Sequence, residues 1–128
     1  MNNIFGIGTD IVNISRIKKS LNKNKKFKNK IFSLNEIKYC ESKLNTIAFY
    51  SKRFAAKEAF VKALGTGVTK GISFNEISIT NNKNGAPFIE LLGKTKTIVK
   101  KILKKKNNIY LSLSDEKKYA LAIVIINF

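Results

Sequence analysis

Hydrophobic residues in the first half of the chain follow first strand-like and then helical spacing. Residues 4–8 form a short apolar run with two glycines, which predicts a strand that lies close to its neighbours. Apolar residues then recur every three or four positions, the spacing of helices with one buried face. These helices are predicted over about residues 12–22, 33–42 and 47–64. The segment 22–30 is rich in lysine and asparagine, and we interpret it as a solvated turn or a frayed helix end.

Local signals mark the ends of the second and third predicted helices. Ser33 and Glu36 have the spacing of a capping box, in which each residue satisfies a backbone N–H of the first turn. Gly65 stands directly after the third helix, where a glycine ends many helices. The long helix therefore ends at about residue 64.

Strands dominate the second half of the pattern. Residues 72–80 alternate like a strand, and 88–92 resume as its partner after a segment rich in turn-forming residues. A basic helix over 95–106 and a closing hairpin over 109–114 and 119–126 complete the chain. With no internal repeat or linker, the pattern predicts one domain over residues 1–128. Its class is α+β, with a mainly antiparallel sheet packed against the long central helix.

Composition adds a strong positive charge to this picture. The 128 residues carry a formal net charge of +17, and of 25 basic residues only Arg16 and Arg53 are arginine. Abundant lysine, asparagine and isoleucine are typical of an AT-rich genome, so composition alone can supply much of the charge. A positive field attracts polyanions of any kind. A small basic RNA- or ribosome-binding protein is therefore the alternative hypothesis, although such proteins usually rely on arginine and exposed aromatic residues.

Several absences narrow the chemistry. The single cysteine, Cys40, cannot form an internal disulfide, which indicates a reducing, cytoplasmic location. The longest apolar run, residues 120–126, is too short to span a membrane. The chain has no histidine, so it lacks the commonest general base and the commonest zinc ligand. Any acid–base chemistry must come from carboxylates, lysine, tyrosine or metal-bound water.

Two carboxylates are the main chemical candidates. Phe54, Glu58 and Lys62 are four residues apart and share one face of the long helix, while Asp10 follows the opening apolar run. If the fold joins Asp10 to Glu58, the pair forms the oxygen-rich site that Mg²⁺ uses beside phosphates. Two simpler interpretations stay open. Glu58 and Lys62 can form an ordinary helix ion pair, and Asp10 can cap the following helix.

At these residues the chain resembles the 4′-phosphopantetheinyl transferases of the small holo-acyl-carrier-protein synthase type. Gly8-Thr9-Asp10 is similar to the family's N-terminal motif. The segment from Phe54 to Lys62, with its Lys57-Glu58 pair, is similar to the family's helical motif. Further landmarks follow in family order, so the resemblance covers essentially the whole chain and implies the fold of that family.

The resemblance implies an activity and a set of ligands. The family transfers the 4′-phosphopantetheine arm of coenzyme A to a serine of apo-acyl carrier protein and releases adenosine 3′,5′-bisphosphate, a step of fatty acid biosynthesis. Asp10 and Glu58 would hold Mg²⁺, and Lys62 would reach the same phosphates. By the same resemblance, the coenzyme A contacts are Arg53, Lys57, Lys62, Gly65, Gly67, Gly85 and Pro87.

The resemblance leaves the proton acceptor open and implies two protein partners. The serine proton would pass to Glu58, through a metal-bound water, or to Lys62. Many relatives carry a histidine at the position of Asp115, and this chain has none to use there. The acidic carrier would bind the basic face of the first helix. The residues of that face are Arg16, Lys18 and Lys19. Family members of this type also form homotrimers with shared active sites, which implies the same assembly here.

Overall fold

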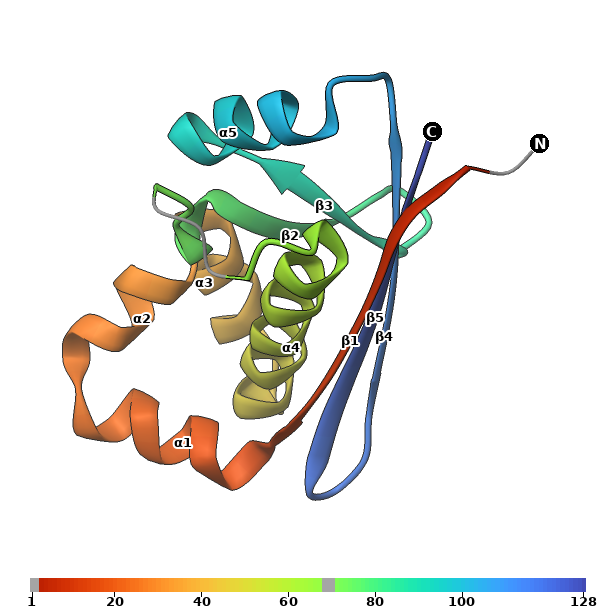
Figure 1. Cartoon of the computed structure of the whole chain (residues 1–128). Helices are drawn as coiled ribbons and strands as arrows, with labels where there is room; N and C mark the ends of the chain where they lie inside the picture. Colours follow the sequence, from red (N-terminus) through yellow and green to blue (C-terminus); the bar gives the residue numbers. More distant parts are fainter. Residues whose placement is uncertain (1–2, 68–70) are drawn as a thin grey trace.

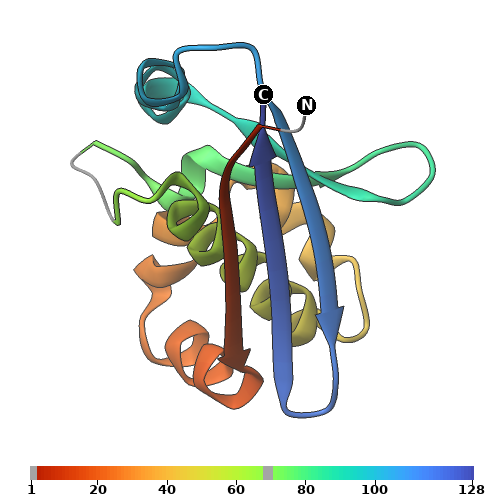
Figure 2. The same ribbon diagram turned by 45° about the vertical axis from the view of Figure 1, so that its right-hand side comes forward.

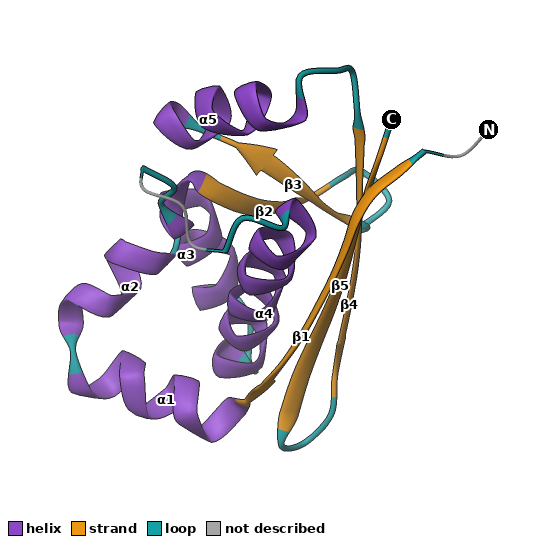
Figure 3. Cartoon of the chain, viewed as in Figure 1, coloured by secondary structure: helices purple, strands orange, loops and turns teal. Residues whose placement is uncertain are grey.

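The computed structural model of the chain describes residues 3–67 and 71–128. These residues form five strands and five α-helices, together with one short 3₁₀ helix (Figures 1 and 3). In chain order they are β1 (Ile4–Asn13), α1 (Ile14–Lys23), α2 (Lys25–Ile31), α3 (Leu34–Glu41), α4 (Thr46–Leu64), the 3₁₀ helix η1 (Phe74–Glu76), β2 (Ile77–Asn81), β3 (Pro87–Leu91), α5 (Gly93–Leu103), β4 (Asn108–Asp115) and β5 (Tyr119–Asn127).

The strands form two antiparallel sheets, with α4 lying across the larger one (Figure 1). The larger sheet has the order β1-β5-β4, and its strands run side by side in front of the helices in Figure 2. The smaller sheet pairs β2 with β3. Alternate residues of β5, from Ala120 to Ile126, are buried against Ala59 and Phe60 of α4. This period of two places one face of the sheet in the main core.

Two glycines let β1 approach α4 more closely than any other residue type would. A Cβ atom on Gly6 would lie 1.8 Å from the carbonyl oxygen of Ala63, and one on Gly8 would lie 1.8 Å from that of Ala59. Neither contact is physically possible, so both positions require glycine. The small alanines on the helix complete the close crossing. Asp10 follows two residues later and therefore also faces α4.

A second hydrophobic cluster joins α1, α2 and α3 to the first half of α4. Its buried members are Ile17, Phe32, Cys40 and Tyr50. The thiol of Cys40 is free, and burial raises its pKa to about 12. The thiol therefore stays protonated and unreactive at neutral pH. The α1–α2 arch in Figure 1 is therefore packed onto α4 by apolar side chains.

A buried ion pair connects α3 and α4 to the smaller sheet. Glu36 is fully buried and accepts hydrogen bonds from the amine of Lys57 at 2.7 Å and from the backbone N–H of Ser33 and of Ile79. Lys57 also donates to the carbonyl oxygens of Phe74 and Ile77. Burial lowers the pKa of Lys57 to about 8, and the adjacent Glu36 opposes that shift. Four elements therefore meet at one pair of charges.

The predicted fold class is confirmed, and four details of the sequence prediction are wrong. β1 extends to Asn13, whose side chain caps α1, so Asp10 is not the helix cap. Residues 25–31 form a helix capped by Asn24 rather than a turn. The strand predicted over 72–80 begins only at residue 77, after η1, and the strands divide into two sheets. Within the described ranges, every helix is too short or too polar to traverse a lipid bilayer.

Candidate active site

Asp10 and Glu58 lie together on the wall of one cavity. The cavity has a volume of about 340 Å³ and lies between β1, α1 and α4. Burial raises the pKa of Glu58, the negative charge of Asp10 raises it further, and Lys62 acts in the opposite direction. Two nearby carboxylates resist simultaneous ionisation unless a cation joins them. The arrangement therefore favours binding of a positive ion.

Lys62 supplies one such positive charge from the side of Asp10. Its amine donates to the carbonyl oxygen of Thr9 at 2.9 Å and lies 3.3 Å from a carboxylate oxygen of Asp10. The simple interpretation of Lys62 as the ion-pair partner of Glu58 is therefore wrong. Just over half of the Lys62 side chain is exposed, so its amine can turn toward a ligand without disturbing the core.

The donor set at this cavity fits Mg²⁺. Asp10 and Glu58 offer carboxylate oxygens, which are the ligands that hard cations prefer, and Mg²⁺ commonly takes only one or two carboxylates beside substrate phosphates. Across residues 3–67 and 71–128, no cluster of three potential Asp, Glu, His or Cys ligands is found. A cation bound here would therefore complete its coordination with oxygens from outside these two side chains, such as water or phosphate.

A second, more apolar cavity adjoins the first. It has a volume of about 570 Å³ and shares Phe27, Phe54 and Glu58 with the carboxylate cavity. The rings of Phe27 and Phe54 stack with their centroids 6.3 Å apart. Phe54 is thus part of the wall between the two cavities. Glu58 reaches both spaces from the middle of α4.

Arg53 marks a separate pocket of about 280 Å³ on another side of α4. The pocket brings it together with Gly85 of the turn between β2 and β3 and with Pro87 at the start of β3. Arg53 is 2% exposed, its guanidinium lies 4.5 Å from the centre of the Tyr39 ring, and it donates to Asn81 at 3.0 Å. Its Nε has no hydrogen-bond partner among the described residues. A buried, incompletely paired cation is a fitting partner for an anion.

Helix geometry separates the Arg53 pocket from the carboxylates. Arg53 and Glu58 are five residues apart, which corresponds to a rotation of about 140° around α4. At the edge of the Arg53 pocket, Lys52 forms an ion pair with Asp115 at 3.1 Å. Asp115 thus lies beside this pocket and away from the Asp10–Glu58 cavity. No local signal in the sequence predicts Lys52, Tyr39 and Asn81 at this pocket, because only the tertiary structure places them there.

The remaining predicted residues fall into three groups. Arg16 lines the carboxylate cavity, and Lys18 and Lys19 are exposed on the same helix. Gly65 ends α4 in the left-handed conformation, with Gly67 two residues further on, also at positive φ. Lys57 is not available to a phosphate, because its amine is fully buried and bound to Glu36 and two carbonyl oxygens. Its predicted contact with coenzyme A is therefore not supported by the geometry.

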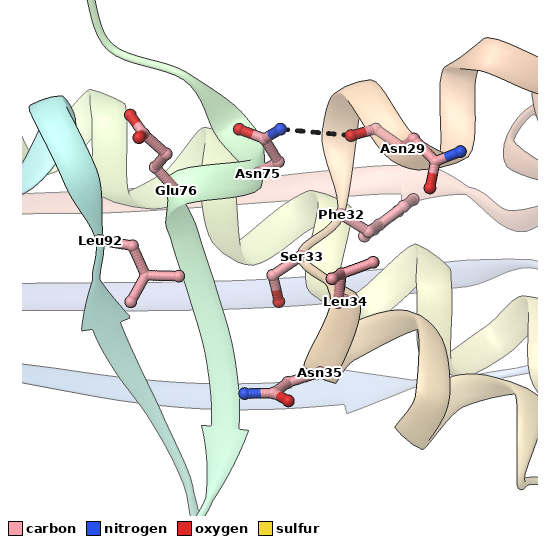
Figure 4. Close-up of a pocket in the computed structure, with 8 residues that line it drawn as sticks. All are labelled: Asn29, Phe32, Ser33, Leu34, Asn35, Asn75, Glu76 and Leu92. Carbon is pink, nitrogen blue, oxygen red and sulfur yellow. Dashed lines mark hydrogen bonds between the residues drawn. The ribbon is translucent and has the colours of Figure 1, made fainter.

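The cavity shown in Figure 4 offers less chemistry. It has a volume of about 580 Å³, and its one charged lining residue is Glu76, which accepts hydrogen bonds from Thr95. Most of its polar lining consists of asparagine amides. One of these, Asn75, donates to the backbone oxygen of Asn29. This cavity lacks the paired carboxylates of the Asp10–Glu58 cavity and the buried arginine of the Arg53 pocket.

Comparisons with known proteins agree with the geometry. The family model of the 4′-phosphopantetheinyl transferase superfamily matches residues 6–124. A holo-[acyl-carrier-protein] synthase of Pelagibacter ubique is 50% identical over 124 residues, which is 96% of each chain.

Two solved structures agree as well. The Plasmodium yoelii acyl carrier protein synthase with ADP bound has a TM-score of 0.85 at 38% identity, covering 99% of this chain and 97% of the other. The Bacillus anthracis holo-(acyl-carrier-protein) synthase in complex with CoA (3′,5′-ADP) has a TM-score of 0.78 at 33% identity, covering 97% and 96%. Paired carboxylates on a β1–α4 crossing and full-length similarity thus lead to the same assignment: the chain belongs to the 4′-phosphopantetheinyl transferase superfamily and, within it, to the holo-[acyl-carrier-protein] synthases.

Proposed function

We propose that this enzyme transfers the 4′-phosphopantetheine arm of coenzyme A to a serine of apo-acyl carrier protein in a Mg²⁺-dependent reaction. The second product is adenosine 3′,5′-bisphosphate, the pathway is fatty acid biosynthesis, and the location is the cytoplasm. One domain, residues 1–128, carries the activity. The main support is the position of Asp10 and Glu58 on one cavity wall, with Lys62 bonded beside Asp10.

The proposed mechanism assigns a role to each polar residue of the carboxylate cavity. Mg²⁺ bound by Asp10 and Glu58 would neutralise the pyrophosphate oxygens of coenzyme A. Lys62 would then turn from Asp10 to a phosphoryl oxygen, where its charge stabilises the negative charge that develops in the transition state. Glu58 is our proposed proton acceptor for the carrier serine, because it lines both adjoining cavities and thus lies where the serine and the phosphates of coenzyme A would meet.

Coenzyme A would need residues from two copies of the chain. We assign the nucleotide end, with its phosphate, to the pocket of Arg53, Gly85 and Pro87, and assign supporting backbone contacts to Gly65 and Gly67. Arg53 and Glu58 face different sides of α4, so one copy cannot offer both to a single ligand as readily as two neighbouring copies can.

The outer face of the larger sheet supports self-association into a homotrimer. This face is opposite α4 and exposes large apolar side chains, including Ile7 at 57%, Ile11 at 63% and Ile123 at 39%. A contiguous apolar surface on a folded protein commonly marks a protein interface. In an Ile123→Asp variant, light scattering should show a smaller species, and activity should fall with it because the shared sites are lost. A variant that stays trimeric would refute the assignment of this face.

The carrier protein would bind on the exposed side of α1. Acyl carrier proteins are acidic, and α1 presents Arg16 at the cavity with Lys18 and Lys19 beside it. Opposite charges accelerate and orient association. Arg53 is buried in its own pocket and Arg16 lines the carboxylate cavity, and we propose no nucleic acid partner.

Carrier modification tests the proposed function directly. The protein is incubated with coenzyme A, Mg²⁺ and apo-carrier, and the mass of the carrier is followed by mass spectrometry. We expect the gain of one phosphopantetheine group, and no gain when Mg²⁺ is removed by a chelator. A folded protein that never modifies the carrier, or that does so equally well without divalent metal, would contradict the proposal.

A further inference from the structure

Helix α5 and the three residues after it carry a dense run of positive charge. Seven of the thirteen residues from 94 to 106 are lysines, and no acidic residue occurs between Glu90 and Asp115. All seven side chains are exposed; they are Lys94, Lys96, Lys100, Lys101, Lys104, Lys105 and Lys106. We call the exposed side of α5, together with Lys104, the α5 face.

Helix geometry separates the α5 face from the side that holds α5 in place. Thr95, Val99 and Leu103 are buried and recur every four residues, so one stripe of the helix packs on the main core. Successive residues differ by about 100°, which places Thr97 and Lys101 about 160° and 200° away from Val99. The lysines are therefore presented to solvent by a helix whose other side is fixed.

The charges of the α5 face are not neutralised within the chain. Among the residues that the structure describes, none of the seven lysines takes part in an ion pair. One of them, Lys105, has its amine 5.5 Å from the centre of the Phe128 ring. The other six are free to meet an anion.

Two carboxylates lie close to α5 and do not cancel this charge. Glu76 is already engaged, because it accepts hydrogen bonds from the backbone and the hydroxyl of Thr95 at the start of the helix. Glu90 lines a pocket of about 290 Å³ with Lys96 and Lys100, yet no ion pair joins these three side chains. The net charge of this region is therefore strongly positive.

Lys104 occupies a backbone conformation that glycine adopts at lower cost. Its φ is 60°, and no other non-glycine residue in the described ranges has a positive φ. Glycine is the usual residue at such a helix end, as Gly65 is at the end of α4. The lysine thus adds a charge to the α5 face at a position where stability alone favours glycine.

The α5 face is separate from the sites described above. α5 and α1 lie at opposite ends of the molecule in both views (Figures 1 and 2). No residue of α5 lines the carboxylate cavity, the apolar cavity beside it or the Arg53 pocket. A ligand of the α5 face therefore leaves the candidate active site accessible.

The composition of the α5 face favours an anionic lipid surface over a nucleic acid. Residues 94–106 contain no arginine and no aromatic residue, which are the side chains that stack on bases and read them. A bilayer with anionic headgroups needs only point charges, and clusters of four to eight basic residues on one helix are typical of proteins that bind it. Each such residue strengthens the attraction roughly fivefold.

We propose that the α5 face binds the surface of membranes rich in anionic phospholipid. Lys100, Lys101 and Lys104 contact headgroup phosphates, with Thr97 near the centre of the contact. The apolar stripe of α5 stays in the protein core, so the chain rests on the surface without inserting into it. This association is independent of the catalytic function proposed above and keeps the enzyme next to the membrane.

Vesicle co-sedimentation tests the proposal with the full chain. Wild-type protein should bind vesicles of mixed phosphatidylglycerol and phosphatidylcholine, should not bind vesicles of phosphatidylcholine alone, and should be released by added salt. The variant with Lys100→Ala, Lys101→Ala and Lys104→Gly should bind about 100-fold more weakly, as expected for the loss of three charges. An unchanged affinity would overturn the proposal.

A second variant separates the α5 face from the net charge of the chain. Lys23→Ala, Lys25→Ala and Lys26→Ala together remove three exposed charges at the opposite end of the molecule. This variant should keep nearly the full affinity for the vesicles. Equal weakening in both triple variants would show that only overall charge matters and would overturn the proposal.

Lys104→Gly alone excludes unfolding as the cause of weaker binding. It should raise the melting temperature, because glycine suits the positive φ, while it weakens vesicle binding roughly fivefold. A variant that is more stable and binds equally well would remove Lys104 from the contact.

A fluorescent label tests the orientation on the membrane. Thr97→Cys and Asn22→Cys place a single reactive thiol on α5 or on α1, because the native Cys40 is buried and does not react. An environment-sensitive dye should shift its emission on anionic vesicles at position 97 and not at position 22. A shift at position 22 alone would overturn the proposal, as would binding of an RNA oligonucleotide to the α5 face at a salt concentration that releases the vesicles.

Discussion

The crossing of β1 over α4 allows a quantitative prediction for Gly8→Ala. The new Cβ would start 1.8 Å from the carbonyl oxygen of Ala59, whereas real Cβ atoms essentially never lie within 3.0 Å of another heavy atom. The strand and the helix must therefore separate by about 1.2 Å, at an overpacking cost of about 1–3 kcal/mol. We expect the melting temperature to fall by roughly 4–12 °C for a chain of this size.

The same displacement should damage the proposed metal site more than the fold. Asp10 is two residues beyond Gly8, so it moves away from Glu58 with the strand. A misplacement of about 1 Å can reduce turnover by roughly 100-fold. Carrier modification measures that loss, and paramagnetic resonance of Mn²⁺, used in place of Mg²⁺, measures the affinity for metal without relying on turnover.

Gly6→Ala provides the control, because its Cβ would clash with Ala63 at the same distance but farther from Asp10. We expect a similar loss of stability with a smaller loss of Mn²⁺ affinity. Equal losses of Mn²⁺ affinity in both variants would refute the link between the crossing and the metal site. An unchanged melting temperature in Gly8→Ala would refute the steric argument itself.

Two further predictions concern charged residues of α4. Glu58→Gln should abolish turnover, yet raise the melting temperature of the metal-free protein at pH 7, because it removes a carboxylate whose pKa is raised by burial and by Asp10. The protonated form is favoured in the folded state, so this gain should vanish as the pH falls below 4.5, and a gain that persists there in thermal scans would contradict it. Lys57→Met should lower stability by about 3–5 kcal/mol in denaturant titrations, because it leaves Glu36 buried without a cation. The double variant with Glu36→Gln should recover much of that loss, and no recovery would disprove the pairwise explanation.

The sequence predicted the central residues of the candidate site because they occur in two motifs. Motif spacing cannot show which way neighbouring side chains point. Lys57 is adjacent to Glu58, but successive helix residues differ by about 100°, which turns Lys57 into the core toward Glu36. Its partner is 21 positions earlier, and nothing local in the sequence connects the two.

Two errors in the predicted elements have similar physical causes. β1 continues to Asn13 because Asn13 pairs with Tyr119 of β5, a contact that a local window does not contain. The lysines of α2 led to the prediction of a solvated turn or a frayed helix end in place of this helix. The Asn24 cap and the apolar pair of Phe27 and Ile31 are the local signals that favour a helix there.

The contact between Lys62 and Asp10 has a consequence for the order of events after synthesis. The ammonium group of Lys62 already offsets the negative charge of Asp10 in the folded chain. Under the proposed function, metal loading would therefore be an exchange, in which a divalent ion takes the place of Lys62 at Asp10 and frees the ammonium group for the substrate.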